Sequence, residues 1–193
     1  MWVVMMVAMM VPTAAPMTLL YAGFRRGRSP AGPIVLPASA FLLGYVVAWS
    51  VFSVAAAALQ VTLERTAVMS PMAMKLDSRA LGGVMLIVAG VFQWTPWKNA
   101  CLSRCRSPIG FFMTSWREGI GGGFLMGVHH GMSCLGCCWA LMLLLFVVGT
   151  MNMLWIAALT ALVLIEKVAP RGDRVARIAG LAMIVAGGST IVA

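Results

Sequence analysis

The sequence predicts an all-α polytopic membrane protein with about six transmembrane helices. Hydrophobic residues make up 62% of the 193 residues and charged residues only 10%, whereas a soluble domain has about 45–50% apolar and about 25% charged residues. Uncharged apolar runs recur along the chain, and a helix needs about 20 such residues to cross the bilayer. This composition excludes a cytosolic enzyme, a secreted disulfide scaffold and a disordered chain.

Six apolar runs are long enough to be membrane spans. We predict one integral membrane domain over residues 1–193, with spans at 2–23, 34–62, 80–96, 119–148, 152–168 and 175–193. The first run has no basic leading segment and no small-residue cleavage site, so we interpret it as a retained span and not as a signal peptide.

The run at 119–148 is longer than a bilayer requires. Its 30 residues would form a helix about 45 Å long, so we expect it to be kinked or partly re-entrant. Glycines permit such a bend, and they stand here at positions 121, 122, 123, 127, 131 and 136.

The basic residues are concentrated in alternate connections between the spans. The chain has 14 Lys and Arg against five Asp and Glu, a net charge of +9. Eleven of the 14 lie in three connections: Arg25, Arg26, Arg28, Lys98, Arg104, Arg106, Arg117, Lys167, Arg171, Arg174 and Arg177. The positive-inside rule places these connections in the cytoplasm and both termini outside. The same bias explains the net charge, so we predict the lipid bilayer as a partner and no nucleic acid.

Both histidines and three of the five cysteines fall between residues 129 and 138. On a helix, residues at i, i+4 spacing share one face and drift by only about 40° per step. Such a ladder is formed by Met126, His130, Cys134, Cys138 and Met142, with His129 and Cys137 beside it. Thiolate, imidazole and thioether form a soft ligand set that suits Cu(I) or Zn(II). We predict a metal site here, for Cu(I) first and for zinc second.

Two other interpretations of this cluster stay open. A buried cysteine is often a small apolar filler, and a histidine inside a membrane often bonds a carbonyl group. Cys134 and Cys137 also have the C-x-x-C spacing that is found in thiol–disulfide proteins. We rank metal binding first because histidine and methionine accompany the cysteines within an apolar span.

Two further groups of soft side chains suggest a secondary metal relay. Cys101 and Cys105 stand at i, i+4 spacing among basic residues, which favour the thiolate form. The charge pattern assigns them to the cytoplasmic face, where thiols stay reduced. Met69, Met72 and Met74 fall in a connection assigned to the outside, and a thioether binds Cu(I) there without oxidising as a thiol would. Packing alone explains either group about equally well.

The acidic residues point to anchoring and not to catalysis. Glu118 beside Arg117 and Glu166 beside Lys167 are interpreted as anchors at the membrane edges. No intramembrane carboxylate suited to a proton relay is identified, which argues against a proton-driven pump. The sequence also has no nucleotide-binding glycine loop and no Ser/His/Asp grouping, so we predict that the protein is not an enzyme.

Three stretches carry a resemblance to a known family. They read AMMVP at 8–12, QWTPWKNACLSRCRSP at 93–108 and MGVHHGMSCLGCCWALM at 126–142. They resemble a bacterial family of predicted metal-binding integral membrane proteins, named DUF2182. The resemblance implies a multi-pass helical protein of the bacterial inner membrane, with His130, Cys134, Cys137 and Cys138 as metal ligands and His129 as a weaker candidate. It also implies that relatives begin further upstream, with an additional N-terminal helix.

Three functions are compatible with these features. The first is a membrane protein that handles Cu(I) as a transporter, or as a chaperone or storage site: external methionines collect the ion, the 130–138 cluster holds it, and Cys101 and Cys105 pass it to a cytoplasmic acceptor. The second is a non-catalytic accessory subunit of a larger membrane complex, because glycine- and alanine-rich helices pack closely. The third is a membrane thiol–disulfide oxidoreductase.

Overall fold

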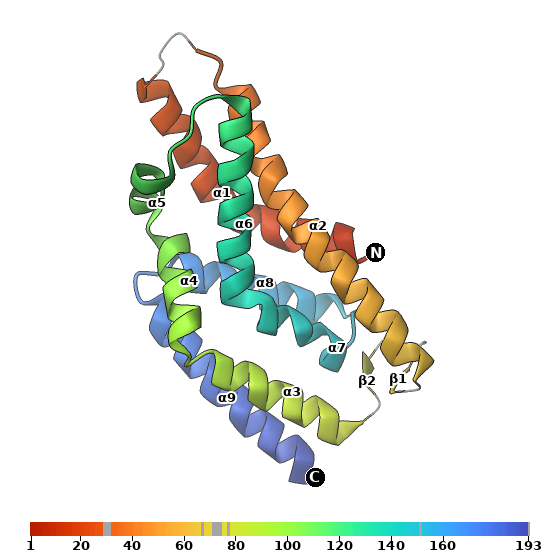
Figure 1. Cartoon of the computed structure of the whole chain (residues 1–193). Helices are drawn as coiled ribbons and strands as arrows, with labels where there is room; N and C mark the ends of the chain where they lie inside the picture. The colour runs from red at the N-terminus through yellow and green to blue at the C-terminus, as the bar shows by residue number, and fades with distance from the viewer. Residues whose placement is uncertain (29–31, 67, 71–74, 77, 151, 193) are drawn as a thin grey trace. The chain divides into compact units, whose positions relative to one another are not determined.

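The structure, a computed structural model, describes residues 1–28, 32–66, 68–70, 75–76, 78–150 and 152–192. In chain order, its elements are α1 (Trp2–Arg28), α2 (Val35–Arg65), β1 (Met69–Ser70), β2 (Lys75–Leu76), α3 (Arg79–Phe92), α4 (Pro96–Arg106), α5 (Pro108–Ser115), α6 (Gly119–Leu143), α7 (Leu145–Val148), α8 (Met153–Val168) and α9 (Gly172–Val192) (Figure 1). The two short strands pair antiparallel, with Met69 opposite Leu76. The all-α polytopic class is confirmed.

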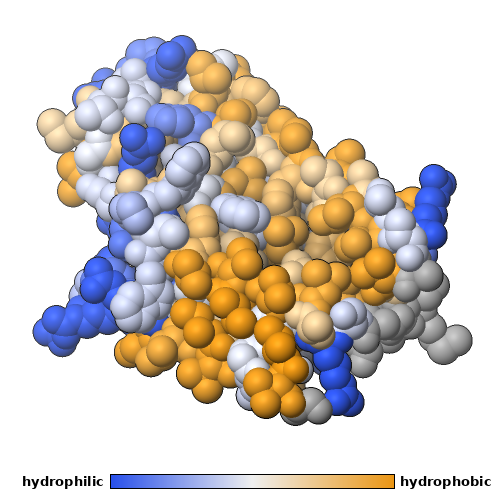
Figure 2. All heavy atoms as spheres, turned by 60° about the horizontal axis from the view of Figure 1, so that its bottom comes forward, coloured by the Kyte–Doolittle hydropathy of each residue, from blue (hydrophilic) through white to orange (hydrophobic). Residues whose placement is uncertain are grey.

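Four helical segments among the described residues are long and apolar enough to cross a membrane. They are α1, α2, the combined segment Gly119–Val148 and α9. A fifth is obtained if α3 and α4, which are bent by 62° at the residues between them, count as one span. The run predicted at 152–168 forms α8, which has 16 residues. Figure 2 shows apolar side chains over much of the visible surface, as expected of a lipid-facing protein.

The chain divides into two compact units. The first unit contains Met1–Val54 and Cys101–Gly136, and the second contains Ala55–Ala100 and Cys137–Ala193. The first therefore holds α1, most of α2, α5 and most of α6, and the second holds α3, α8 and α9. Each unit is built on close contacts between glycine-bearing helix faces.

In the first unit, three glycines of the 119–148 run form a packing face of α6. A Cβ at Gly123 would lie 2.7 Å from the carbonyl oxygen of Pro37, and a Cβ at Gly127 would overlap the carbonyl oxygen of Phe41. A Cβ at Gly131 would lie 2.7 Å from the Cβ of Ala48. Glycine at i, i+4, i+8 spacing thus lets the α6 backbone approach α2 closely. The break in the run falls at Leu144, between α6 and α7, and not among these glycines.

In the second unit, α3 and α9 run side by side (Figure 1). Glycines of the two helices face one another. A Cβ at Gly187 would lie 2.6 Å from the carbonyl oxygen of Gly83, and the reciprocal distance is 2.7 Å. Gly90 and Gly180 form a second such pair, at 2.6 and 2.7 Å. The two pairs are seven residues apart on each helix, so both lie on the same face.

Gly187→Ala is expected to destabilise the protein by about 1–3 kcal/mol, the usual effect of forcing extra atoms into a packed interface. The neighbouring Gly188→Ala is the control, because a Cβ there would meet no heavy atom of the described residues within 4 Å. That change should be neutral or should stabilise the helix by up to about 1 kcal/mol. Thermal unfolding in detergent measures both variants, and equal effects would contradict the assigned interface.

Candidate metal site

The two adjacent histidines of α6 have different surroundings in the first unit. His130 is buried, with 2% of its surface exposed, and its ring stacks against Phe41 at 5.9 Å and Tyr45 at 5.6 Å between centroids. His129 is exposed, and its ring centroid lies 5.4 Å from that of Phe111 on α5. Phe111 also contacts His130 edge-on at 5.8 Å. The pair therefore presents one imidazole to the interior and one to the surface.

Cys134, one turn after His130, lies beside a buried hydroxyl group. Its Sγ is 3.2 Å from the Tyr45 hydroxyl oxygen, and both residues are fully buried. The Tyr45 hydroxyl also lies 3.3 Å from the Met10 carbonyl oxygen and 3.3 Å from the Thr13 hydroxyl oxygen. Thr13 in turn donates to the Met10 carbonyl oxygen at 2.8 Å. The thiol thus sits at the end of a short polar chain inside an apolar helix bundle.

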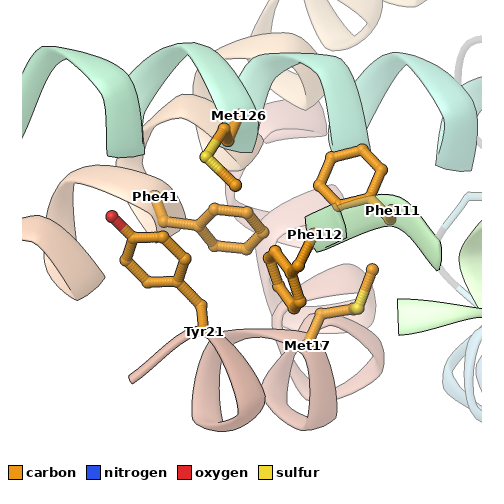
Figure 3. Close-up of a cluster of buried hydrophobic side chains, with 6 residues drawn as sticks. All are labelled: Met17, Tyr21, Phe41, Phe111, Phe112 and Met126. Atoms are coloured by element: carbon orange, nitrogen blue, oxygen red, sulfur yellow. The ribbon is translucent and has the colours of Figure 1, made fainter. Parts of the chain in front are cut away.

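Met126, the first residue of the predicted ladder, belongs to the hydrophobic core. It packs in a cluster from four helices, shown in Figure 3: Met17, Tyr21, Phe41, Phe111, Phe112 and Met126. Tyr21 stacks on Phe41 with ring centroids 5.2 Å apart. The Met126 Sδ accepts a hydrogen bond of 3.3 Å from the Arg117 backbone N–H. Met126 therefore packs in this cluster. The cluster holds α5 against the side of α6 that carries the histidines.

Cys137, Cys138 and Met142 continue α6 into the second unit. All three are buried, with exposed fractions of 1%, 0% and 0%. The predicted spacing of His130, Cys134 and Cys138 is retained on one uninterrupted helix. All five cysteines are present as thiols. Within the described residues, however, no three His, Cys, Asp or Glu side chains come together as a metal-binding group.

The residues of the predicted relay have varied environments. Cys101 is half-buried and Cys105 is buried, and both lie on α4 at the predicted spacing. Met69 lies in β1 with only 1% of its surface exposed, so it does not offer its sulfur at the surface. Met72 and Met74 lie outside the described residues.

Glu118 has a different partner from the one that the sequence suggested. It was interpreted as an anchor beside Arg117, but its Oε2 lies 3.2 Å from Arg25 Nη1, and its Oε1 accepts a 2.6 Å hydrogen bond from Trp116 Nε1. Arg25 also donates to the Pro33 carbonyl oxygen. The ion pair joins the end of α1 to the segment that precedes α6. The basic end of α1 and the Arg117–Glu118 segment therefore lie close together in the first unit.

Glu166 was also misinterpreted from its sequence neighbour. It was interpreted as an anchor at the membrane edge, but its side chain is only 2% exposed and its Oε2 lies 2.7 Å from Lys98 Nζ, which is fully buried. Gln93 donates to Glu166 Oε1 at 3.2 Å and accepts a hydrogen bond from Lys98. A buried charge requires such partners. The second unit therefore contains a buried carboxylate, which the sequence pattern alone does not reveal.

The sequence held only a weak signal for this polar cluster. Gln93 and Lys98 stand five residues apart around the bend between α3 and α4, within a segment rich in tryptophan. That pattern is also typical of a membrane interface. The third member, Glu166, is 68 residues from Lys98 in the chain, so only the fold identifies the pair.

Together, the fold and these residues define an all-α multi-pass membrane protein with soft donor side chains buried along one helix. A family model named PpoB2 and described as a copper chaperone matches residues 1–190. The chain belongs to this copper chaperone family. The match does not carry the name DUF2182, although copper agrees with the metal binding that the earlier resemblance implied. No curated protein and no solved structure matches the chain.

Glu166→Gln is expected to destabilise the protein by about 3–5 kcal/mol, because it leaves the Lys98 charge buried without its counter-charge. The double variant Glu166→Leu/Lys98→Met should recover most of that loss, since an apolar pair of similar size replaces both charges. Glu118→Gln is the matched control: its side chain is 63% exposed, so its effect should stay within about 1 kcal/mol. Unfolding in detergent tests the series, and a Glu166→Gln effect no larger than that of the control would contradict the buried pair.

Proposed function

We propose that this protein is a membrane-embedded copper chaperone that holds Cu(I) at His130 and Cys134. The observation that carries the proposal is the position of a buried thiol beside the Tyr45 hydroxyl, one helical turn from a buried imidazole. Thiolate and imidazole are ligands that suit copper, and thiolate in particular selects Cu(I). Cys137 and Cys138 are proposed as further ligands because they follow on the same helix at i+3 and i+4 from Cys134.

The polar chain at Tyr45 supports this role chemically. Copper binds a thiolate, so Cys134 loses a proton when it takes up the ion. The Tyr45 hydroxyl has one hydrogen and lies between the Met10 carbonyl oxygen and the Cys134 sulfur. We propose that it donates to the carbonyl when Cys134 is a thiol and to the sulfur when Cys134 is a thiolate. Thr13 donates to the same carbonyl oxygen, which keeps that acceptor satisfied in the loaded state.

The remaining assignments extend the same proposal. Zinc is a second possible cargo, because thiolate and imidazole ligands suit it as well. Cys101 and Cys105 are proposed to pass copper to a cytoplasmic acceptor, and Met69, Met72 and Met74 to assist on the other side. His129 and Met142 flank the proposed ligands on α6. The protein is proposed to act without catalysis in a bacterial inner membrane, with its basic connections in the cytoplasm.

An accessory subunit of a larger membrane complex is the second candidate function. Exposed apolar side chains on α9, such as Leu181 and Val185, support it, because they offer a surface to a neighbouring helix as readily as to lipid. If this is the function, we expect the purified protein to contain no copper.

Copper analysis tests the proposal. Protein purified anaerobically and loaded with Cu(I) should retain about one copper per chain at a thiolate-rich site. The Cys134→Ser/Cys138→Ser variant should lose it, whereas Cys105→Ser, which changes a buried cysteine of α4, should retain it. Copper retained by the double variant, or absent from the parent protein, would contradict the proposal.

Tyr45→Phe tests the polar chain separately from the ligands. The variant keeps the ring that stacks on His130 but removes the hydroxyl group, so Cu(I) affinity should fall by about 10- to 100-fold, as is typical for loss of a group that supports a metal ligand. Tyr21→Phe is the matched control, since Tyr21 is equally buried and its hydroxyl has no hydrogen-bond partner among the described residues. Competition with a Cu(I) chelator measures both affinities. Equal affinities in the two variants would contradict the role of Tyr45.

A further inference from the structure

The first unit has two adjoining hollows, of about 410 and 650 Å³, on the side of α6 that faces α5. His129, Thr114 and Ser115 line both. Arg104 lines the first hollow and Arg117 the second. His129 therefore borders both hollows, each of which is lined by one arginine, and the two hollows together are called the depression below.

The lining of this depression combines apolar side chains with hydroxyl groups and two positive charges. The hydroxyl groups of Ser103, Ser107, Thr114 and Ser115 contribute to it, and its described lining contains no acidic residue. An exposed histidine on a membrane helix is costly if it faces lipid. The hydroxyl and guanidinium groups that line the depression give His129 polar neighbours. Such a surface attracts anions and repels a bare metal cation.

Phe111 lines the depression and also contacts the buried His130. Its ring lies 5.4 Å from that of His129 and 5.8 Å from that of His130. His130 is in turn one helical turn from Cys134. The Phe111 side chain thus lies beside both the exposed imidazole and the buried one, between the depression and the proposed copper ligands.

We propose that this depression is the exchange port of the buried copper site, and that it admits Cu(I) as a complex with a small anionic ligand. Arg104 and Arg117 bind the anionic groups, and the His129 imidazole displaces one ligand of the complex. The copper then passes Phe111 to His130 and Cys134, and the proton of the Cys134 thiol leaves to solvent with the displaced anion. Copper stays Cu(I) throughout, and the displaced anion returns to solvent. This inference rests on the proposed copper site and adds its route of access.

Exchange kinetics test the port. The copper-loaded protein is mixed with an excess of bathocuproine disulfonate, an anionic Cu(I) chelator, and the rise of the coloured complex is followed with time. His129→Ala should slow the transfer by about tenfold, which corresponds to about 1.4 kcal/mol of barrier. Its equilibrium affinity for Cu(I) should stay within about twofold of the parent, a difference well below 1 kcal/mol. A Cys134→Ser variant should instead lose the affinity itself.

The arginines are tested with chelators that differ in charge. Neocuproine has the same phenanthroline core without the sulfonates. Arg104→Gln/Arg117→Gln should slow transfer to the disulfonate several-fold and leave transfer to neocuproine unchanged. Arg174→Gln/Arg177→Gln on α9 is the control, because it removes the same net charge from exposed positions of the second unit.

The outcomes separate the port from the site. Unchanged rates in His129→Ala, or equal slowing by the two arginine pairs, would overturn the port while leaving the copper site intact. A parent protein without copper at equilibrium would overturn the proposed function and the port with it. Slower transfer in His129→Ala at unchanged affinity, together with charge-selective slowing in Arg104→Gln/Arg117→Gln, would support both.

Discussion

The close approach of α6 to α2 is the constraint on which the first unit depends. Added Cβ atoms at Gly123, Gly127 and Gly131 would meet the backbone or the Cβ of α2, so no larger residue fits at these positions without separating the helices. This approach brings the Tyr45 hydroxyl within 3.2 Å of the Cys134 sulfur and stacks the Tyr45 ring on His130. If α2 and α6 were slightly further apart, the Cys134 thiol would lose its contact with the Tyr45 hydroxyl. The same glycines therefore determine both the packing and the chemistry of the candidate site.

Contacts between polar groups hold helix ends in place in both units. In the second unit, Lys98 and Glu166 are withdrawn from solvent together, and Gln93 satisfies both. In the first unit, Arg25 and Glu118 join the end of α1 to the segment before α6. Each arrangement holds the end of a helix, and for Lys98 and Glu166 the pairing also offsets the cost of burying charge. The exposed His129 also has polar neighbours, because serine, threonine and arginine side chains line the hollows beside it.

The sequence predicted the features that depend on local periodicity and composition. The all-α polytopic class and the helical spacing of His130, Cys134 and Cys138 could be derived from hydropathy and the 3.6-residue period. The glycines of α6 were expected to permit a bend, but they pack against α2, because a glycine pattern does not specify its partner. Tyr45, Phe111 and the Lys98–Glu166 pair could not be found at all. Their roles arise from contacts between residues far apart in the chain.

The two histidines have different surroundings, one buried and one exposed. In the proposed function, the buried His130 retains the ion and the exposed His129 allows exchange. X-ray absorption at the copper edge of the Cu(I)-loaded protein tests the central claim most directly. If copper binds at His130 and Cys134, we expect sulfur in the first coordination shell together with the outer-shell scattering of an imidazole ring. A first shell of oxygen or nitrogen alone would contradict it.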